Sequence, residues 1–309
     1  TPFITELVLE KHGQTKLDFS KTSIHRLSID LTGVEELRLN DDLEELLLLG
    51  DMSDNCQILV KDHGASLRLQ LDSSLPKVLG LKDLGAIHCS NILEIDFAQI
   101  LNNYPNLREL RLWGKPGHIL NFHKLSELKE LINFSTVDLF GFTAEDIPKP
   151  EDLPQLSMFW MSSLPEDAAK VAKKYYKKLQ DKGLNLWITK PRTAEWLAQN
   201  LDNPFRSWDG QENISTANAK KAASLYRKTR ASVIKLLENP NEDTMKHIEV
   251  LIREYTQGFN KMDKRNCFIE TIEREDIYDA LVEILDLLPE DLGMDKEKFI
   301  EIFDELKDF

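Results

Sequence analysis

The chain has 309 residues, of which 41% are hydrophobic and 30% charged, a composition typical of a globular protein with room for two domains. Its formal net charge of −14 argues against general nucleic-acid binding and against docking on anionic membranes. No apolar run reaches the roughly 18 residues of a membrane-spanning helix, and the cysteines Cys56, Cys89 and Cys267 are few and far apart. We therefore expect a cytoplasmic protein with reduced thiols and without a nucleic-acid or membrane partner.

A recurring apolar spacing, L-x-x-L-x-L, is the main signal in the first 190 residues. The alternation of apolar and polar residues inside each copy predicts a short strand with one buried face. Recurrence of such a unit predicts stacked ribs, each of which buries its apolar edge against its neighbours. The clear copies, two looser copies and a last strand-like segment lie at 4–9, 24–29, 34–39, 43–48, 107–112, 128–133, 153–158 and 183–188.

The spacing between copies grows along the chain and leaves room for helices in the later ribs. Segment 165–183, PEDAAKVAKKYYKKLQDKG, has Pro165 and two acids at its start, lysines in its later turns and Gly183 at its end. These are the start and stop signals of a helix. The close-set copy at 34–39 predicts strands on both sides of the early ribs, whereas residues 50–95 lack a clear period and receive no rib.

Segment 102–114, NNYPNLRELRLWG, resembles the leucine-rich repeat pattern, including the P-N-L that leads into the strand. The resemblance implies a curved solenoid, and proteins of this family mostly bind other proteins. The copies are irregular and lack a regular Asn after the L-x-L. We therefore predict an α/β solenoid of irregular leucine-rich repeats, with strands and short helices, over residues 1–190, followed by an all-α helical module over 191–309.

The same spacing predicts which side chains face outward, because the leucines point into the core and the residues between them point away from it. The outward set is Glu36, Arg38, Glu45, Glu109, Arg111, Glu130 and Ser157, and Trp113 and Phe159 lie just beyond their strands. An Arg beside an exposed Trp is a typical interface anchor; the alternative is that Trp113 packs against the adjacent rib. The predicted site for a protein partner consists of Arg38, Glu109, Arg111, Trp113 and Phe159.

Helical patterns follow Pro191. After a short helix at 194–201 and a loop at 202–213, helix 214–239 opens with Ser215 as its N-cap. Asn241 is the predicted cap of a second helix, with Glu242 and Asp243 in its first turn. Its apolar stripe consists of Met245, Ile248, Ile252, Tyr255, Phe259 and Met262. Two further helices are predicted at about 273–288 and at 295–309.

One face of helix 214–239 is basic. Its cations are Lys220, Lys221, Arg227, Lys228 and Lys235. Such a stripe can hold phosphate, face an acidic helix or keep the helix solvated, and we favour the solvated face. No aromatic residues interleave with it, so a nucleic-acid groove is not predicted.

The segment 268–281, FIETIEREDIYDAL, is rich in carboxylates. On a helical wheel Glu275, Asp276, Asp279, Glu283 and Asp286 share the face opposite the apolar residues, which predicts a solvated surface. Continued as helix, Glu270 and Glu273 would lie over the apolar side, but we expect them to precede or begin the helix, with Thr271 as a candidate cap. A carboxylate held near the core needs a partner, and Arg206, Arg253 and Arg274 are the candidates. Together with SWDG and ANAKKAASLYRKTR, this segment is similar to a helical tail of bacterial leucine-rich-repeat proteins of unassigned function.

Two hypotheses follow for function. The leading one is a bacterial cytoplasmic protein that recognises a protein partner with the exposed strand face. The alternative is an enzyme with a carboxylate site, with or without a divalent metal, in the helical module. The residues of that possible second site are Arg206, Trp208, Asp209, Glu270 and Glu273. The sequence has no H-E-x-x-H, Walker loop, G-x-S-x-G or paired C-x-x-C, and we assign no catalytic residue, metal ligand or cofactor.

Overall fold

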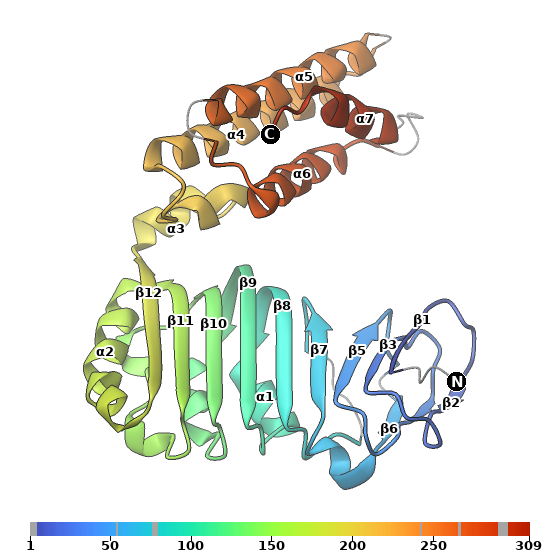
Figure 1. Cartoon of the computed structure of the whole chain (residues 1–309), viewed down its shortest axis with the longest axis vertical. Helices are drawn as coiled ribbons and strands as arrows, with labels where there is room; N and C mark the ends of the chain where they lie inside the picture. Colours follow the sequence, from blue (N-terminus) through green and yellow to red (C-terminus); the bar gives the residue numbers. More distant parts are fainter. Residues whose placement is uncertain (1–4, 54, 76–79, 242, 265–266, 290–295) are drawn as a thin grey trace. The chain divides into compact units, whose positions relative to one another are not determined.

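A computed structural model of the chain describes residues 5–53, 55–75, 80–241, 243–264, 267–289 and 296–309 (Figure 1). Ile4, Glu242 and Asp295, which belong to elements predicted above, lie outside these ranges. The chain divides into two compact units, 1–194 and 195–309, which we call the sheet unit and the helical unit. The sequence places the boundary close by, at Pro191.

The sheet unit is built on a large parallel sheet in which nine strands follow one another in the order β1-β3-β5-β7-β8-β9-β10-β11-β12 (Figure 1). These strands are β1 (Glu6–Leu9), β3 (Arg26–Asp30), β5 (Glu45–Leu49), β7 (Arg68–Asp72), β8 (Ala86–Asp96), β9 (Glu109–Leu120), β10 (Asn133–Phe140), β11 (Met158–Pro165) and β12 (Asn185–Arg192). A second parallel sheet has the order β2 (Lys16–Asp18), β4 (Glu36–Arg38) and β6 (Gln57–Leu59).

The prediction of an α/β solenoid over residues 1–190 is wrong, because residues 1–194 form an α/β unit around one large parallel sheet. The strands of that sheet lengthen from 4 residues in β1 to 12 in β9, and the second sheet ends with β6. The L-x-x-L-x-L spacing reports a strand with one buried face. Any parallel sheet with one covered face shares that property, so the spacing does not identify a repeat architecture.

In the described residues of the sheet unit, two α-helices and several 3₁₀ turns lie between the strands. They are α1 (Phe97–Asn103), α2 (Glu166–Tyr176), η1 (Lys61–Gly64), η2 (Phe122–Glu127), η3 (Ala144–Asp146), η4 (Pro150–Asp152) and η5 (Lys177–Lys182). The predicted helix at 165–183 is confirmed as α2 and η5, and Gly183 ends it with a φ of 99°. Phe159 of β11 lies between Tyr176 of α2 and Phe134 of β10, with ring centroids 4.5 and 5.6 Å away. The helices therefore cover the face of the sheet that carries the aromatic core.

The segment GKPGH, 114–118, lies within β9. A Cβ at Gly114 would stand 2.1 Å from the carbonyl oxygen of Asp138 in β10. A Cβ at Gly117 would stand 2.4 Å from the carbonyl oxygen of Ile92 in β8. The two glycines therefore let both neighbouring strands approach β9 where the pairing register shifts.

The helical unit contains α3 (Ala194–Asn200), η6 (Pro204–Trp208), α4 (Thr216–Glu238), α5 (Thr244–Asp263), α6 (Thr271–Leu285) and α7 (Lys296–Leu306). Ser215 caps α4 as predicted, since its side chain accepts a hydrogen bond from the amide of Asn218. The apolar stripe of α5 is confirmed, because Ile248, Ile252, Tyr255 and Phe259 are fully buried. None of the described helices is long and apolar enough to cross a membrane.

Truncation of Phe159 tests the packing between the sheet and α2. Phe159→Ala should lower the free energy of unfolding by about 3–5 kcal/mol, because it empties a fully buried site between two aromatic rings. Urea denaturation measures the change, and Val8→Ala, at an exposed position of β1, is the control with an expected change within about 0.5 kcal/mol. Equal stability of the two variants would contradict this packing.

Candidate functional site

The outward face of the large sheet carries its side chains in rows that cross the strands. In a parallel sheet, the residues that pair across neighbouring strands point their side chains to the same face and so lie beside one another. One row consists of Arg26, Glu45, Arg68, Ala86, Glu109 and Asn133. The next consists of Gln70, His88, Arg111, Ser135, Trp160 and Trp187.

Glu109 is the centre of a charged cluster on this face. Its Oε1 lies 2.5 Å from His88 Nε2, 3.2 Å from Arg111 Nε and 3.6 Å from Arg68 Nε. Its Oε2 accepts a hydrogen bond from Asn133 Nδ2 at 3.1 Å. The side chain is only 12% exposed, and this burial alone would raise its pKa. Hydrogen bonds from His88 and Asn133, with the charge of Arg111, outweigh burial and lower the pKa of Glu109.

Arg68 connects the charged cluster to Glu45 on β5. Arg68 Nη1 also lies 2.6 Å from Glu45 Oε1, so this arginine bridges two carboxylates, and Arg26 lies 3.3 Å from the other oxygen of Glu45. Burial lowers the pKa of His88, and the charges of Arg111 and Arg68 lower it further, while its contact with Glu109 acts in the opposite direction. His88 is therefore predominantly neutral at pH 7.

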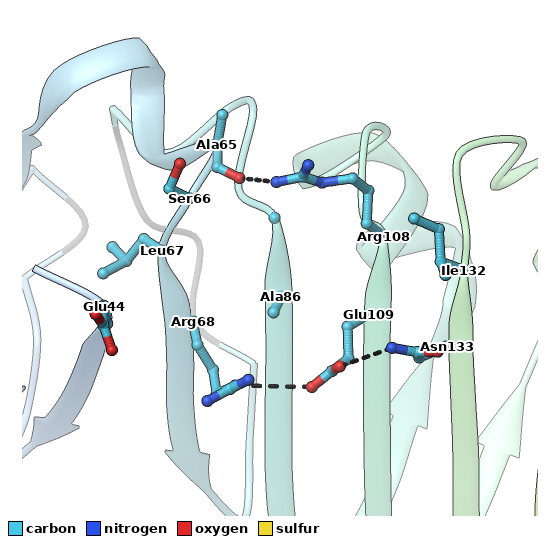
Figure 2. Close-up of a pocket in the computed structure, with 11 residues that line it drawn as sticks. Glu44, Ala65, Ser66, Leu67, Arg68, Ala86, Arg108, Glu109, Ile132 and Asn133 are labelled. Carbon is cyan, nitrogen blue, oxygen red and sulfur yellow. Dashed lines mark hydrogen bonds and ion pairs between the residues drawn. The ribbon is translucent and has the colours of Figure 1, made fainter. Parts of the chain in front are cut away.

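A pocket of about 350 Å³ opens beside this cluster at the start of β7 to β10 (Figure 2). Its walls include Arg68, Glu109 and Asn133, and the dashed lines in Figure 2 join these three side chains. On the opposite wall the guanidinium of Arg108 donates a hydrogen bond to the carbonyl oxygen of Ala65. Contacts within the sheet unit thus hold Arg68, Arg108, Glu109 and Asn133 in place around the pocket.

Exposed tryptophans lie on the same face, and we call Trp113, Trp160 and Trp187 the tryptophan patch. Their exposed fractions are 51%, 37% and 50%. Trp160 and Trp187 occupy paired positions of β11 and β12, with ring centroids 5.9 Å apart in an edge-to-face arrangement. Trp160 Nε1 donates to Asn185 Oδ1 at 3.0 Å. Trp113 lies two residues beyond Arg111 on β9.

Part of the predicted partner site is brought together by β9. Glu109, Arg111 and Trp113 alternate along this strand and share its outward face. Trp113 is half exposed, which does not fit the alternative that it packs against a neighbouring strand. Arg38 lies instead in the second sheet, where it pairs with Glu36 at 2.9 Å.

The placement of Phe159 on the exposed face is wrong, because Phe159 is fully buried. In β11 the inward residues are Phe159 and Met161, three positions later than the Leu156 and Met158 of the predicted frame. An odd shift exchanges the two faces of a strand. Because of this shift, the sequence analysis did not predict that Trp160 faces outward. Trp187 alternates with the apolar residues of GLNLWI, so its outward position could have been predicted from the sequence.

The residues of the possible second site in the helical unit make separate structural contacts and do not form one site. Trp208 is buried and donates from Nε1 to Asp276 Oδ2 at 2.8 Å. Asp209 accepts from Trp196 Nε1 at 2.9 Å, and Arg206 Nη1 donates to a backbone carbonyl at 3.2 Å. Among the described residues, no group of three histidine, cysteine or carboxylate side chains could hold a metal ion.

Glu270 and Glu273 form the start of α6. Glu273 Oε2 accepts from the amide of Glu270 at 3.0 Å, and Oε1 accepts from Asn213 Nδ2 at 3.0 Å. The expected arginine partners of Glu273 make other contacts, since Arg253 pairs with Glu249 and Arg274 donates to the carbonyl of Phe309. Glu273 is therefore a buried helix-capping carboxylate.

The predicted solvated face of α6 is wrong for two of its acids. Burial raises the pKa of Asp276, and the hydrogen bond from Trp208 only partly offsets that effect. Glu283 accepts a hydrogen bond from the hydroxyl of Tyr226 in α4 at 3.2 Å. Glu275, Asp279 and Asp286 are exposed as predicted.

The chain matches no protein-family model, and comparisons with curated proteins and with solved structures also find no match. The resemblance of segment 102–114 to leucine-rich repeats stays a prediction. The candidate site therefore rests on the geometry of the outward face.

The charged cluster predicts a pH dependence of stability. The folded pKa of Glu109 is lowered, so its stabilising contribution is present above its unfolded pKa and is lost as the pH falls through the folded value. The folded pKa of His88 is also lowered, so protonation below about pH 6.5 favours the unfolded chain. The unfolding free energy should fall on acidification, and the fall between about pH 7 and pH 5 should be smaller in His88→Gln.

Urea denaturation across this pH range measures both profiles. His247→Gln, which replaces an exposed histidine of α5 outside the charged cluster, is the control and should keep the wild-type profile. Identical profiles for His88→Gln and the wild-type chain would contradict the assigned role of His88.

The capping role of Glu273 predicts a graded loss of stability. Glu273→Ala should lower the unfolding free energy by about 1–2 kcal/mol, because an amide at the start of α6 and the Asn213 side chain lose their acceptor. Glu273→Gln retains an acceptor oxygen and should cost less. Glu275→Ala, exposed on the same helix, is the control, and a loss as large in this variant would refute the cap.

Proposed function

We propose that this protein recognises a protein partner with the outward face of β9 to β12. The observation that carries the proposal is the tryptophan patch, in which three half-exposed indoles lie on one face of the sheet. Isolated apolar residues are ordinary on a surface, but a group of exposed tryptophans is typical of a binding site. Tryptophan and arginine are the residue types that most often anchor protein interfaces, and Arg111 lies two residues before Trp113.

The charged cluster supports this proposal through preorganisation. Glu109 holds Arg111 and Arg68 from one side, and Glu45 holds Arg68 from the other. Side chains that are already ordered lose less conformational entropy when a partner binds. The face therefore offers a fixed polar region beside an apolar one, as protein interfaces commonly do.

We place this binding protein in a bacterial cytoplasm. The three cysteines are free thiols, and Cys56 and Cys89 are buried, as is usual for a protein of a reducing compartment. The net charge of −14 supports a protein partner over nucleic acid or an anionic membrane.

Loss of the tryptophan patch should abolish partner capture without unfolding the chain. The double variant Trp113→Ala/Trp187→Ala should weaken binding of the captured protein by at least about 30-fold, since an anchoring tryptophan contributes about 2 kcal/mol or more. The measurement is affinity capture from lysate of the source cell, followed by titration of the retained protein against each variant. Arg111→Ala should weaken binding in the same direction.

Val8→Ala is the matched control, since Val8 is an exposed apolar residue on β1 of the same sheet. It should retain the partner with unchanged affinity. Full capture by a folded Trp113→Ala/Trp187→Ala variant would show that the patch is not the binding site.

A further inference from the structure

A groove of about 830 Å³ lies wholly within the helical unit, between α3, η6 and the first half of α4. Its lining includes Trp196, Asn200, Asp209, Ala223, Lys220 and Arg227. The volume falls within the range of about 300–1,000 Å³ that small-molecule sites occupy. The groove shares no residue with the charged cluster or the tryptophan patch, and its function is independent of the proposed protein recognition.

The side of the groove formed by α4 carries two cations, Lys220 and Arg227, and two small residues, Ala219 and Ala223. Thr216, Lys220, Ala223 and Arg227 line the groove at intervals of three or four residues, so they share one side of the helix, and Ala219 lines it as well. Lys220 is exposed, and within the described part of the chain no carboxylate pairs with it. Arg227 Nη1 donates to the carbonyl oxygen of Gln199 at 3.3 Å, which fixes its guanidinium between α3 and α4.

The two cations lie seven residues apart, which is about 10 Å along the helix axis. This is the spacing of the backbone positions. Lysine carries its charge on a flexible four-carbon stem, so an anion with two neighbouring charged groups can contact both side chains. Lysine and arginine are the usual protein partners of phosphate groups.

The opposite wall is aromatic and prearranged. The indole of Trp196 is half-buried, and its Nε1 donates to Asp209 Oδ2 at 2.9 Å. Asn200 Nδ2 donates to the carbonyl oxygen of Trp196 at 2.8 Å, and Asn200 Oδ1 accepts from Asn203 at 2.9 Å. The carboxylate that lines the groove is thus already engaged by the indole, and a planar ring has an aromatic surface to contact.

We propose that this groove binds a nucleoside diphosphate, with the base against Trp196 and the two phosphates toward Lys220 and Arg227. The two phosphates supply negative charge to the cationic side of the groove, and the planar base can contact the aromatic ring of Trp196. Neither a nucleoside nor inorganic diphosphate alone satisfies both walls.

Isothermal titration calorimetry of the full chain with ADP, adenosine and inorganic diphosphate tests the proposal. ADP should bind with one site per chain and at least about tenfold more tightly than adenosine or diphosphate. Lys220→Gln should weaken ADP binding by about tenfold or more, because it removes one charge-assisted contact from an exposed, unpaired position. ADP should also raise the melting temperature of the wild-type chain.

Lys235→Gln is the matched control, since Lys235 is exposed on α4 but does not line the groove. Equal weakening in Lys235→Gln and Lys220→Gln would overturn the proposal, because it would indicate general attraction to the basic face. Absence of ADP binding at about 1 mM would overturn it too. Tighter binding of a short polyglutamate peptide than of ADP would assign the groove to an acidic protein segment instead.

Discussion

In-register pairing of nine parallel strands is the constraint on which the sheet unit and its candidate site depend. Pairing in register aligns one residue from each strand into a row across the sheet. Successive rows point to opposite faces of the sheet. The inner rows supply Phe134 and Phe159 to the core beneath α2. The same register determines which side chains are neighbours on the outer face, so Trp160 lies beside Trp187. The recognition surface is therefore fixed by the backbone pairing that also builds the core.

The sequence predicted the positions of several strands of the sheet unit. It was less successful in predicting which residues of each strand face inward and how the strands assemble. Around 107–112 the alternation gave the correct inward and outward faces, and Glu109, Arg111 and Trp113 are neighbours as expected. Around 153–161 the apolar residues Leu153, Leu156 and Phe159 recur every three residues and fit two frames, and the pairing of β11 with β10 selects the later frame. His88 and Arg68 escaped prediction because their importance comes from residues about 20 to 40 positions away in the chain.

The helical unit shows a different limit of sequence patterns. The apolar period correctly predicted its helices and the buried stripe of α5. The same period placed Asp276 in solvent, yet Trp208, 68 residues earlier, donates a hydrogen bond to it. A helical wheel describes one helix in isolation, and it carries no information about a buried donor on another segment. Acidic residues on a polar face can thus be structural contacts as well as solvated surface.

The order of the strands in the large sheet has a consequence for folding. Glu6 pairs with Arg26, and Met158 pairs with Asn185, so a strand finds its partner within about 20 to 30 residues. Closing loops of this length costs little more entropy for the last strand than for the first. The sheet can therefore form by successive addition of each new strand to the strand before it. During synthesis, the emerging chain can extend the sheet from β1 toward β12.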